Sequence, residues 1–273
     1  MIVIPKSLLS VCGFILLAVI SLFAQVTQVA EKPVNSKKAD EKQAAVLQNI
    51  TGEQVAESVI LVYGGFRGRE TLNQIRKTAI ERGKIIQNNS DGSTNNASYE
   101  KRVIRGESLD KDKIRLDQKY NNAEFALIYD GTKIFGLFGD TIFAPKKEAV
   151  VAFQNQTWRG VEALLRYKEN ASKVDLFGRE KFLGVEYYVL DLTDKEERKT
   201  RFFVSTKLVR IASIEYTEDS IKYVRKFYNF NYAQGTLVPS RTTLLANGKQ
   251  IEEATISTVT YGQKLDDAYF EGN

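Results

Sequence analysis

Histidine is absent from this sequence of 273 residues, and cysteine, methionine and tryptophan each occur once. Without histidine, the chain has no serine–histidine–aspartate triad and no histidine-ligated metal site. A single cysteine, Cys12, cannot build a zinc finger or an iron–sulfur cluster. These absences exclude most common enzyme mechanisms, so the sequence predicts no enzyme activity, no catalytic residue, no metal site and no cofactor.

The chain also lacks a strong excess of basic over acidic residues, or of acidic over basic ones. The 39 Lys and Arg residues outnumber the 34 Asp and Glu residues by five, which is too small an excess to predict a nucleic-acid partner. Hydrophobic residues make up 43% of the chain, a share typical of globular rather than disordered proteins. We therefore expect a folded protein that binds no nucleic acid.

The first residues have the pattern of a secretory signal peptide. Lys6 precedes an apolar run from Leu8 to Phe23, which is shorter than the roughly 20 residues of a transmembrane helix. Ala24 then offers a cleavage site, with a retained membrane anchor as the alternative. We expect residues 1–24 to be removed and the mature protein to be exported to the periplasm.

Cys12 lies inside this signal peptide, before most of the apolar run, whereas the cysteine of a lipoprotein signal follows that run. The mature chain would then have no cysteine and would depend on its core alone in an oxidising compartment. Residues 25–50 are polar and charged, and we expect them to form a flexible N-terminal arm. A single domain is predicted over residues 51–273.

Two helices are predicted at the start of this domain. Thr51 and Gln54 form a capping-box pattern, and the apolar spacing after them predicts an amphipathic helix that ends at Gly64-Gly65. A second short helix is expected to run toward Gly83. Its apolar stripe consists of Leu72, Ile75 and Ala79.

Beyond Gly83 the apolar period changes to two, which indicates a mainly β domain. Asp130-Gly131 predicts a two-residue hairpin turn, with Tyr129 opposite Thr132 and Leu127 opposite Ile134. Both faces of this hairpin are apolar, although antiparallel sheets usually leave one face to solvent. We therefore expect another segment to cover the second face, and one face of the hairpin to line a ligand cavity. The residues predicted to line it are Phe125, Leu127, Tyr129, Ile134 and Phe138.

The segment from Pro145 to Glu169 is the clear helical interruption of the β region, and we expect it to be the cover. Pro145 suits the first turn of a helix, and Thr157 is expected to cap a second helix. The predicted lid residues are Val150, Phe153, Trp158, Val161 and Leu165. Seven further strands are expected between Val174 and Val259, with a second hairpin turn at Asn247-Gly248, as in an antiparallel meander or open barrel.

Ser98 and Lys101 match the serine–lysine spacing of penicillin-recognising enzymes. That motif needs a helix start and two partner motifs; neither partner motif occurs, and the pair lies in a predicted strand. The many tyrosines and phenylalanines of the second half are more suggestive, either as plain core or as the wall of a cavity for an apolar ligand.

The order of these features resembles the LolA-like family of periplasmic lipoprotein carriers and outer-membrane lipoprotein-sorting proteins. The similar features are the leading helix ending in Gly-Gly, the strand before Asp130-Gly131 and the helices between Pro145 and Tyr167. Gly235 to Pro239, the Asn247-Gly248 hairpin and the closing stretch from Leu265 to Phe270 complete the pattern.

This resemblance implies an unclosed antiparallel half-barrel of about eleven strands, with an N-terminal helix and a helical lid over its hydrophobic mouth. It implies a periplasmic carrier that shields lipoprotein acyl chains or lipid without a cofactor, with membrane-bound donor and acceptor proteins as partners. In the family an arginine at the end of an early strand latches the lid, and Arg105 is the nearest match, although Gly106 replaces the family's proline. The alternative is a periplasmic interaction or sensor module of the same fold that recognises a partner protein without lipid transport.

Overall fold

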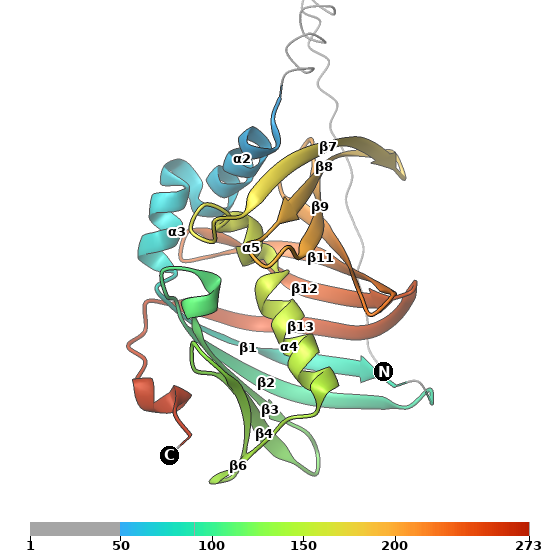
Figure 1. Cartoon of the computed structure of the whole chain (residues 1–273). Coiled ribbons are helices and arrows are strands. Elements are labelled where there is room, and N and C mark those ends of the chain that lie inside the picture. The colour runs from blue at the N-terminus through green and yellow to red at the C-terminus, as the bar shows by residue number, and fades with distance from the viewer. Residues whose placement is uncertain (1–49, 90, 273) are drawn as a thin grey trace, which may run out of the picture. The chain divides into compact units, whose positions relative to one another are not determined.

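The computed structural model describes residues 50–89 and 91–272, so the predicted signal peptide and all but the last residue of the predicted arm lie outside the described residues. The described chain contains thirteen strands and a small number of helices (Figure 1). The helices are α2 (Gly52–Gly64), α3 (Arg69–Ile75), α4 (Lys147–Trp158) and α5 (Val161–Leu165), with short 3-10 turns η1 (Gly65–Arg67), η2 (Leu109–Lys111) and η3 (Asp267–Phe270).

The strands of the first half are β1 (Thr78–Asn88), β2 (Thr94–Ile104), β3 (Lys113–Lys119), β4 (Glu124–Tyr129), β5 (Ile134–Phe138) and β6 (Thr141–Phe143). Those of the second half are β7 (Lys173–Phe182), β8 (Val185–Thr193), β9 (Lys199–Ser205), β10 (Ile211–Glu218), β11 (Ile221–Ala233), β12 (Thr236–Ala246) and β13 (Lys249–Tyr261).

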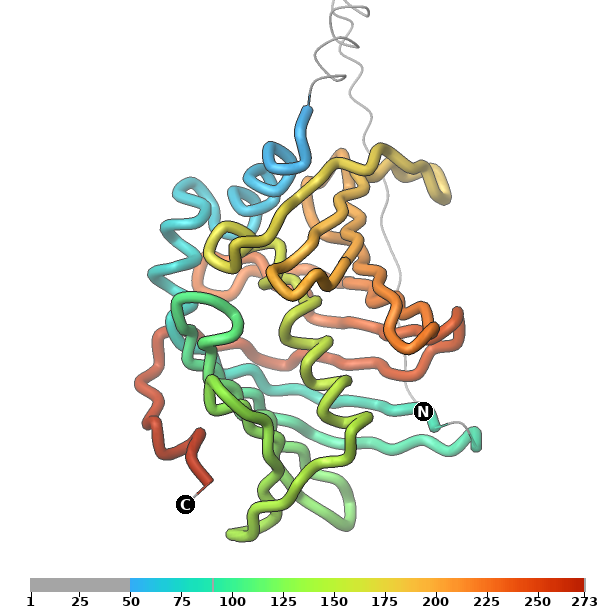
Figure 2. The backbone as a smooth tube through the Cα atoms, viewed as in Figure 1, coloured from blue at the N-terminus to red at the C-terminus, as the bar shows by residue number. Residues whose placement is uncertain are grey.

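All thirteen strands form one antiparallel sheet in the order β6-β5-β4-β3-β2-β1-β13-β12-β11-β10-β9-β8-β7. Neighbours in sequence pair as a meander, and β1 joins the two halves by pairing with β13. The sheet curls around α4 and α5 but does not close, since β6 and β7 remain as its two edges (Figures 1 and 2). The predicted half-barrel is therefore confirmed, with thirteen strands instead of about eleven.

The N-terminal helix forms as its sequence predicts. Thr51 Oγ1 accepts a hydrogen bond from the Gln54 amide at 3.2 Å, and the Gln54 side chain accepts one from the Thr51 amide at 2.9 Å. Each side chain thus satisfies a free backbone donor of the first turn. The helix ends at Gly64, and Gly65 has a positive φ of 66°, which a glycine adopts without strain.

The second helix is shorter than expected, and this prediction was wrong at its C-terminal end. Helix α3 stops at Ile75, and Ala79 lies in strand β1 rather than on a helical stripe. Ala79 is paired with Tyr261 of β13 on one side and with Val103 of β2 on the other. Pairing with a strand on each side outweighs a short helical periodicity, because it satisfies the backbone groups of the whole segment.

The hairpin after β4 has a different register from the predicted one. Tyr129 lies opposite Ile134 rather than Thr132. The Asp130 carboxylate accepts hydrogen bonds from the amides of Thr132 (2.8 Å) and Lys133 (2.9 Å), so the turn is centred on Gly131 and Thr132. Because the register moved by two residues, each side chain still lies on the predicted face.

Both faces of this hairpin are buried, as expected, but by different parts of the chain. Leu127 and Tyr129 pack in a cluster with Phe153 of the lid segment. Ala126 and Ile128 pack on the other face with Phe270 of the C-terminal turn η3. The segment expected to provide the cover therefore covers one face, and the C-terminal segment covers the other.

The helical region begins near Pro145, as predicted, but its second helix starts later than expected. Thr157 lies in the last turn of α4, where its hydroxyl donates to the Phe153 carbonyl at 3.0 Å. Gly160 is the N-cap of α5, so Trp158 belongs to α4 and Val161 to α5. The break falls at Gly160 because glycine is a poor helix former and needs no side-chain space there.

Candidate functional site

A cavity of about 930 Å³ lies between the sheet and the helices α4 and α5. Its walls come from β1, β2, β3, β4 and β10 to β13 and from the helices α4 and α5. These two helices lie across the inner side of the curled sheet (Figure 1). The apolar wall includes Ile85, Val103, Ile114, Leu116, Leu127 and Phe153. A volume of this size is in the range of sites that hold drug-sized or larger ligands.

Alternation along the strands places these apolar groups in the cavity. Ile114 and Leu116 are two residues apart on β3 and point to the same face, where Leu116 lies opposite Leu127 of β4. Their intervening neighbour Arg115 points to the other face and donates to Asp117 at 2.9 Å. The side chains of β3 thus alternate between the cavity and the opposite face of the sheet.

Of the residues predicted to bind ligand, Leu127 lines the cavity. Phe125, Tyr129 and Ile134 belong to the same apolar cluster and pack beside it. The Tyr129 hydroxyl donates to the Asp110 carbonyl at 2.7 Å, which fixes its ring. Phe138 lies at the end of β5 with 57% of its surface exposed.

The predicted lid residues divide between two helices. Phe153 of α4 and Val161 of α5 line the cavity, whereas Leu165 is buried in the main core. Trp158 packs edge-on against Tyr129 with ring centroids 5.8 Å apart. Val150 is half-buried near the start of α4.

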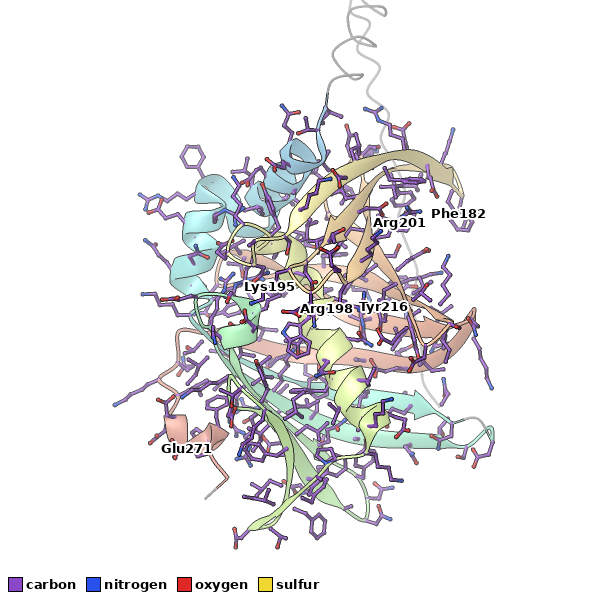
Figure 3. All side chains as sticks on the ribbon, viewed as in Figure 1. Phe182, Lys195, Arg198, Arg201, Tyr216 and Glu271 are labelled. Carbon is purple, nitrogen blue, oxygen red and sulfur yellow. The ribbon has the colours of Figure 1, made fainter. Side chains whose placement is uncertain are left out.

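The C-terminal end of α4 is fixed to the sheet by two arginines. Arg159 donates to Glu218 at 3.0 Å and to the Lys199 carbonyl at 2.7 Å. Arg198, on the loop between β8 and β9, points toward α4 and lies 4.8 Å from the Trp158 ring centroid (Figure 3). The first two residues of the same helix, Lys147 and Glu148, are exposed, so α4 is held more firmly at its C-terminal end.

Arg105, the predicted latch, follows β2 directly and contacts two helices. Its guanidinium donates to the Leu72 carbonyl of α3 at 3.1 Å and to the Glu162 carboxylate of α5 at 3.3 Å. A side chain anchored on the sheet thus reaches α5, the second helix of the predicted lid. This geometry does not need a proline at the position of Gly106, whose carbonyl instead accepts a hydrogen bond from Arg166 at 2.7 Å.

Four further charged residues surround Arg105, and sequence reasoning did not identify them. Arg76 donates to Glu162 at 2.5 Å and to the Leu237 carbonyl at 2.9 Å. Arg166 contacts both carboxylate oxygens of Asp112, at 2.9 and 2.8 Å. These residues come from separate segments of ordinary charge density, so no local motif indicated that they meet.

Burial and pairing set the titration of this cluster. Burial alone would raise the pKa of Glu162, but Arg76, Arg105 and Arg166 outweigh it and lower that pKa to about 2. Burial raises the pKa of Asp112 above its ordinary value, with Arg166 opposing the change. Glu162 is therefore ionised at neutral pH and serves as the counter-ion of two arginines.

The floor of the cavity also carries polar groups. The Tyr99 hydroxyl donates to Glu81 at 2.8 Å, and burial together with Glu81 raises the pKa of that tyrosine. Arg225 donates to Glu252 at 3.0 Å. The cavity is thus mainly apolar with a few charged and polar groups, a composition typical of small-molecule binding sites.

The serine–lysine pair is separated by the sheet. Lys101 lines the cavity together with Tyr99, whereas Ser98 is exposed and points to the opposite face, as an odd spacing along a strand requires. Within residues 50–89 and 91–272, no group of three or more histidine, cysteine, aspartate or glutamate side chains is placed to hold a metal ion. In the same residues, no helix combines the length and apolarity needed to cross a membrane.

No protein-family model matches the sequence, and a search of curated proteins finds no match either. Solved structures do match. A DUF1329 family protein from Desulfovibrio piger has a TM-score of 0.57 at 11% identity, covering 81% of this chain and 97% of its own. A LolA superfamily protein from Nitrosomonas europaea has a TM-score of 0.55 at 13% identity, covering 81% of this chain and 98% of its own.

The chain has the LolA-like fold. An outer-membrane lipoprotein-sorting protein domain from Vibrio parahaemolyticus agrees, with a TM-score of 0.50 at 12% identity over 75% of this chain and 93% of that domain. At identities of 11 to 13% the likeness concerns the LolA-like fold itself. Ligand and partner must be argued from the residues of this chain.

Proposed function

We propose that this protein is an exported periplasmic binding or carrier protein that shields an apolar or acylated ligand in its half-barrel. The observation that carries the proposal is the cavity of about 930 Å³ with apolar walls between the sheet and the lid. Its mechanism is sequestration rather than catalysis. Leu127 forms the ligand surface directly, and Phe125, Tyr129 and Ile134 pack beside it in the same apolar cluster.

Energetics favour a ligand that is only partly covered. Burying a methylene group contributes about 0.8 kcal/mol, so a sixteen-carbon chain would contribute on the order of 12 kcal/mol if fully buried. Three such chains would exceed the practical affinity limit of roughly 20 kcal/mol. A carrier that releases its ligand therefore needs a lid that opens, and the exposed start of α4 is the part of the lid with the fewest contacts to break.

The proposal also includes export of the protein to the periplasm. A signal peptide over residues 1–24, an arm over residues 25–50 and one LolA-like domain over residues 51–273 would place the cavity in the periplasm. There, lipoproteins or lipids and the membrane-bound proteins that donate or accept them would be the partners. The described part of the chain has no cysteine, so it is compatible with an oxidising compartment.

The lid should exchange its amide hydrogens unevenly. Helix α4 begins with the exposed residues Lys147 and Glu148, whereas Ala163, Leu164 and Leu165 of α5 are fully buried. We expect residues 147–154 to exchange faster than α5 and than the well-buried strands β9 and β10, because local opening there breaks few contacts. Hydrogen exchange followed by mass spectrometry would check this. Equally slow exchange in α4 and these two strands would indicate a sealed core instead of a lid.

The proposed function predicts that the protein purified from its native source contains bound lipid. Protein purified from its native envelope should release acyl-containing lipid or lipopeptide into an organic extract, and mass spectrometry would identify it. The same preparation should begin near residue 25. A delipidated sample should regain an acyl-chain dye with a Kd in the micromolar range, about −8 kcal/mol. An extract without lipid, together with no dye binding, would contradict the proposal.

One observation favours the sensor alternative. Phe182, Leu183 and Val185 are exposed at the tip of the β7–β8 hairpin, and Phe182 points away from the body of the protein (Figure 3). Exposed apolar tips of this kind are typical of protein-contact surfaces. A stable complex with a protein partner and no extractable lipid would select this alternative.

A further inference from the structure

One end of the cavity carries an excess of positive charge. We call it the arginine end and define it by Arg76, Arg105 and Arg166, which all line the cavity. The carboxylates that face these three guanidinium groups are Asp112 and Glu162. Three positive charges thus meet two negative ones, and among the residues that the structure describes one positive charge remains without a counter-ion.

This excess charge is buried. The arginine side chains are 8%, 8% and 2% exposed, and within the described residues the Arg166 Nε has no hydrogen-bond partner. A charge removed from water is costly unless it is paired. Glu162 has the most exposed side chain of these five charged residues, at 35%. Because the residue lies deep in the protein and lines the cavity, this exposed surface faces the cavity.

Arg105 is the least well paired of the three. Arg76 contacts Glu162 at 2.5 Å, and Arg166 contacts both Asp112 oxygens within 2.9 Å. Arg105 has one carbonyl at 3.1 Å and the second Glu162 oxygen at 3.3 Å. Burial lowers the pKa of Arg105, with Glu162 opposing the change, which agrees with incomplete neutralisation.

The rest of the cavity has the opposite charge balance. Its basic lining residues are Lys101, Lys147 and Arg225. Its acidic lining residues are Glu81, Glu148, Glu218, Asp219 and Glu252. Glu218 is paired with Arg159, which lies outside this lining, so one negative charge is in excess away from the arginine end. The field along the cavity attracts an anion toward Arg105 and repels it elsewhere.

We propose that the ligand is an acidic amphiphile whose anionic head, a carboxylate or a phosphate, binds Arg105 at the arginine end while its chain lies along the apolar wall toward Leu127. This rests on the proposed function and names its ligand class. The head supplies the missing negative charge, and it competes with the weaker of the two Glu162 contacts. Guanidinium groups bind both carboxylates and phosphates through paired hydrogen bonds.

The test compares three ligands with the same chain: dodecanoate, dodecyl phosphate and dodecanol, each below its aggregation concentration at neutral pH. Isothermal titration calorimetry should show at least one of the two anions binding at least about tenfold more tightly than dodecanol. Arg105→Gln should remove that advantage and leave dodecanol binding unchanged. Glu162→Gln, which removes a competing anion, should increase the advantage. Lys101→Gln, also in the cavity wall, is the matched control and should weaken the anions less than Arg105→Gln does.

The outcomes separate the two proposals. If no ligand binds, the proposed function fails. If dodecanol binds as tightly as both anions, or if Arg105→Gln weakens all three ligands equally, the acidic head is refuted while an apolar cavity stands. Thermal unfolding checks that each variant is folded, and Arg105→Lys replaces Arg105→Gln if the latter unfolds, with a smaller loss of the anion advantage expected. A difference between dodecanoate and dodecyl phosphate identifies the head group.

Discussion

Ile128→Glu should unfold the protein, whereas the same substitution at the adjacent Leu127 should leave it folded but unable to hold an acyl probe. Ile128 has no exposed surface and packs against Phe270 on the closed side of the hairpin. A glutamate there would be a buried carboxylate, and Arg115 on the opposing strand is already engaged by Asp117 and the Tyr269 carbonyl, so we expect a cost of several kcal/mol. That is a large part of the 5–15 kcal/mol that stabilises a typical domain.

Leu127 is almost as buried, with 6% of its surface exposed, but it lines the cavity. A glutamate at this position can extend its carboxylate into that space, where Gln118 and Asn155 also line the wall. We therefore expect a smaller loss of stability, about 1–3 kcal/mol. An acyl chain would then have to bury against a charge, so binding should fall by at least tenfold.

Thermal unfolding and titration with a fluorescent acyl dye measure the two effects in parallel. Phe125→Glu should resemble Leu127→Glu because it lies on the same face of β4. Phe138→Glu is the exposed control and should change neither measurement, since 57% of that residue is already in solvent. If Leu127→Glu unfolds the protein as completely as Ile128→Glu, or leaves dye binding intact, the hairpin does not line the ligand site.

The same hairpin shows how far the sequence could predict the site. Alternation along β4 predicted which side chains share a face, and this survived an error of two residues in the register because the period of a strand is two. The turn itself was misplaced because the Asp130 carboxylate binds the amides of Thr132 and Lys133. That interaction depends on a side-chain conformation that the Asp-Gly pattern alone does not specify.

Other parts of the site depend on contacts between distant segments. The cover of the second hairpin face is Phe270, more than 130 positions from Ile134. The arginine end joins α3, the residue after β2, the segment before β3 and α5. The periodicity of a single helix or strand does not predict contacts between distant segments. The family resemblance suggested Arg105, whereas the contacts of Arg76, Arg166 and Asp112 were identified only from the structure.

Asp112→Ala should cost the fold about 3–5 kcal/mol, because it leaves the Arg166 guanidinium buried without its carboxylate. The Gly106 amide would also lose its acceptor, now 2.8 Å away. For a domain of this size such a loss lowers the melting temperature by roughly 10 °C. Chemical denaturation would measure the change in the free energy of unfolding.

Asp110→Ala, two residues away, is the matched control. Its carboxylate contacts Ser108 and Lys195 near the surface, at 2.6 and 2.9 Å, and exposed ion pairs of this kind contribute about 1 kcal/mol or less. Arg166→Met in the Asp112→Ala background should recover part of the lost stability, because the unpaired charge is then removed. If the two alanine variants lose equal stability, Asp112 and Arg166 do not act as a buried pair.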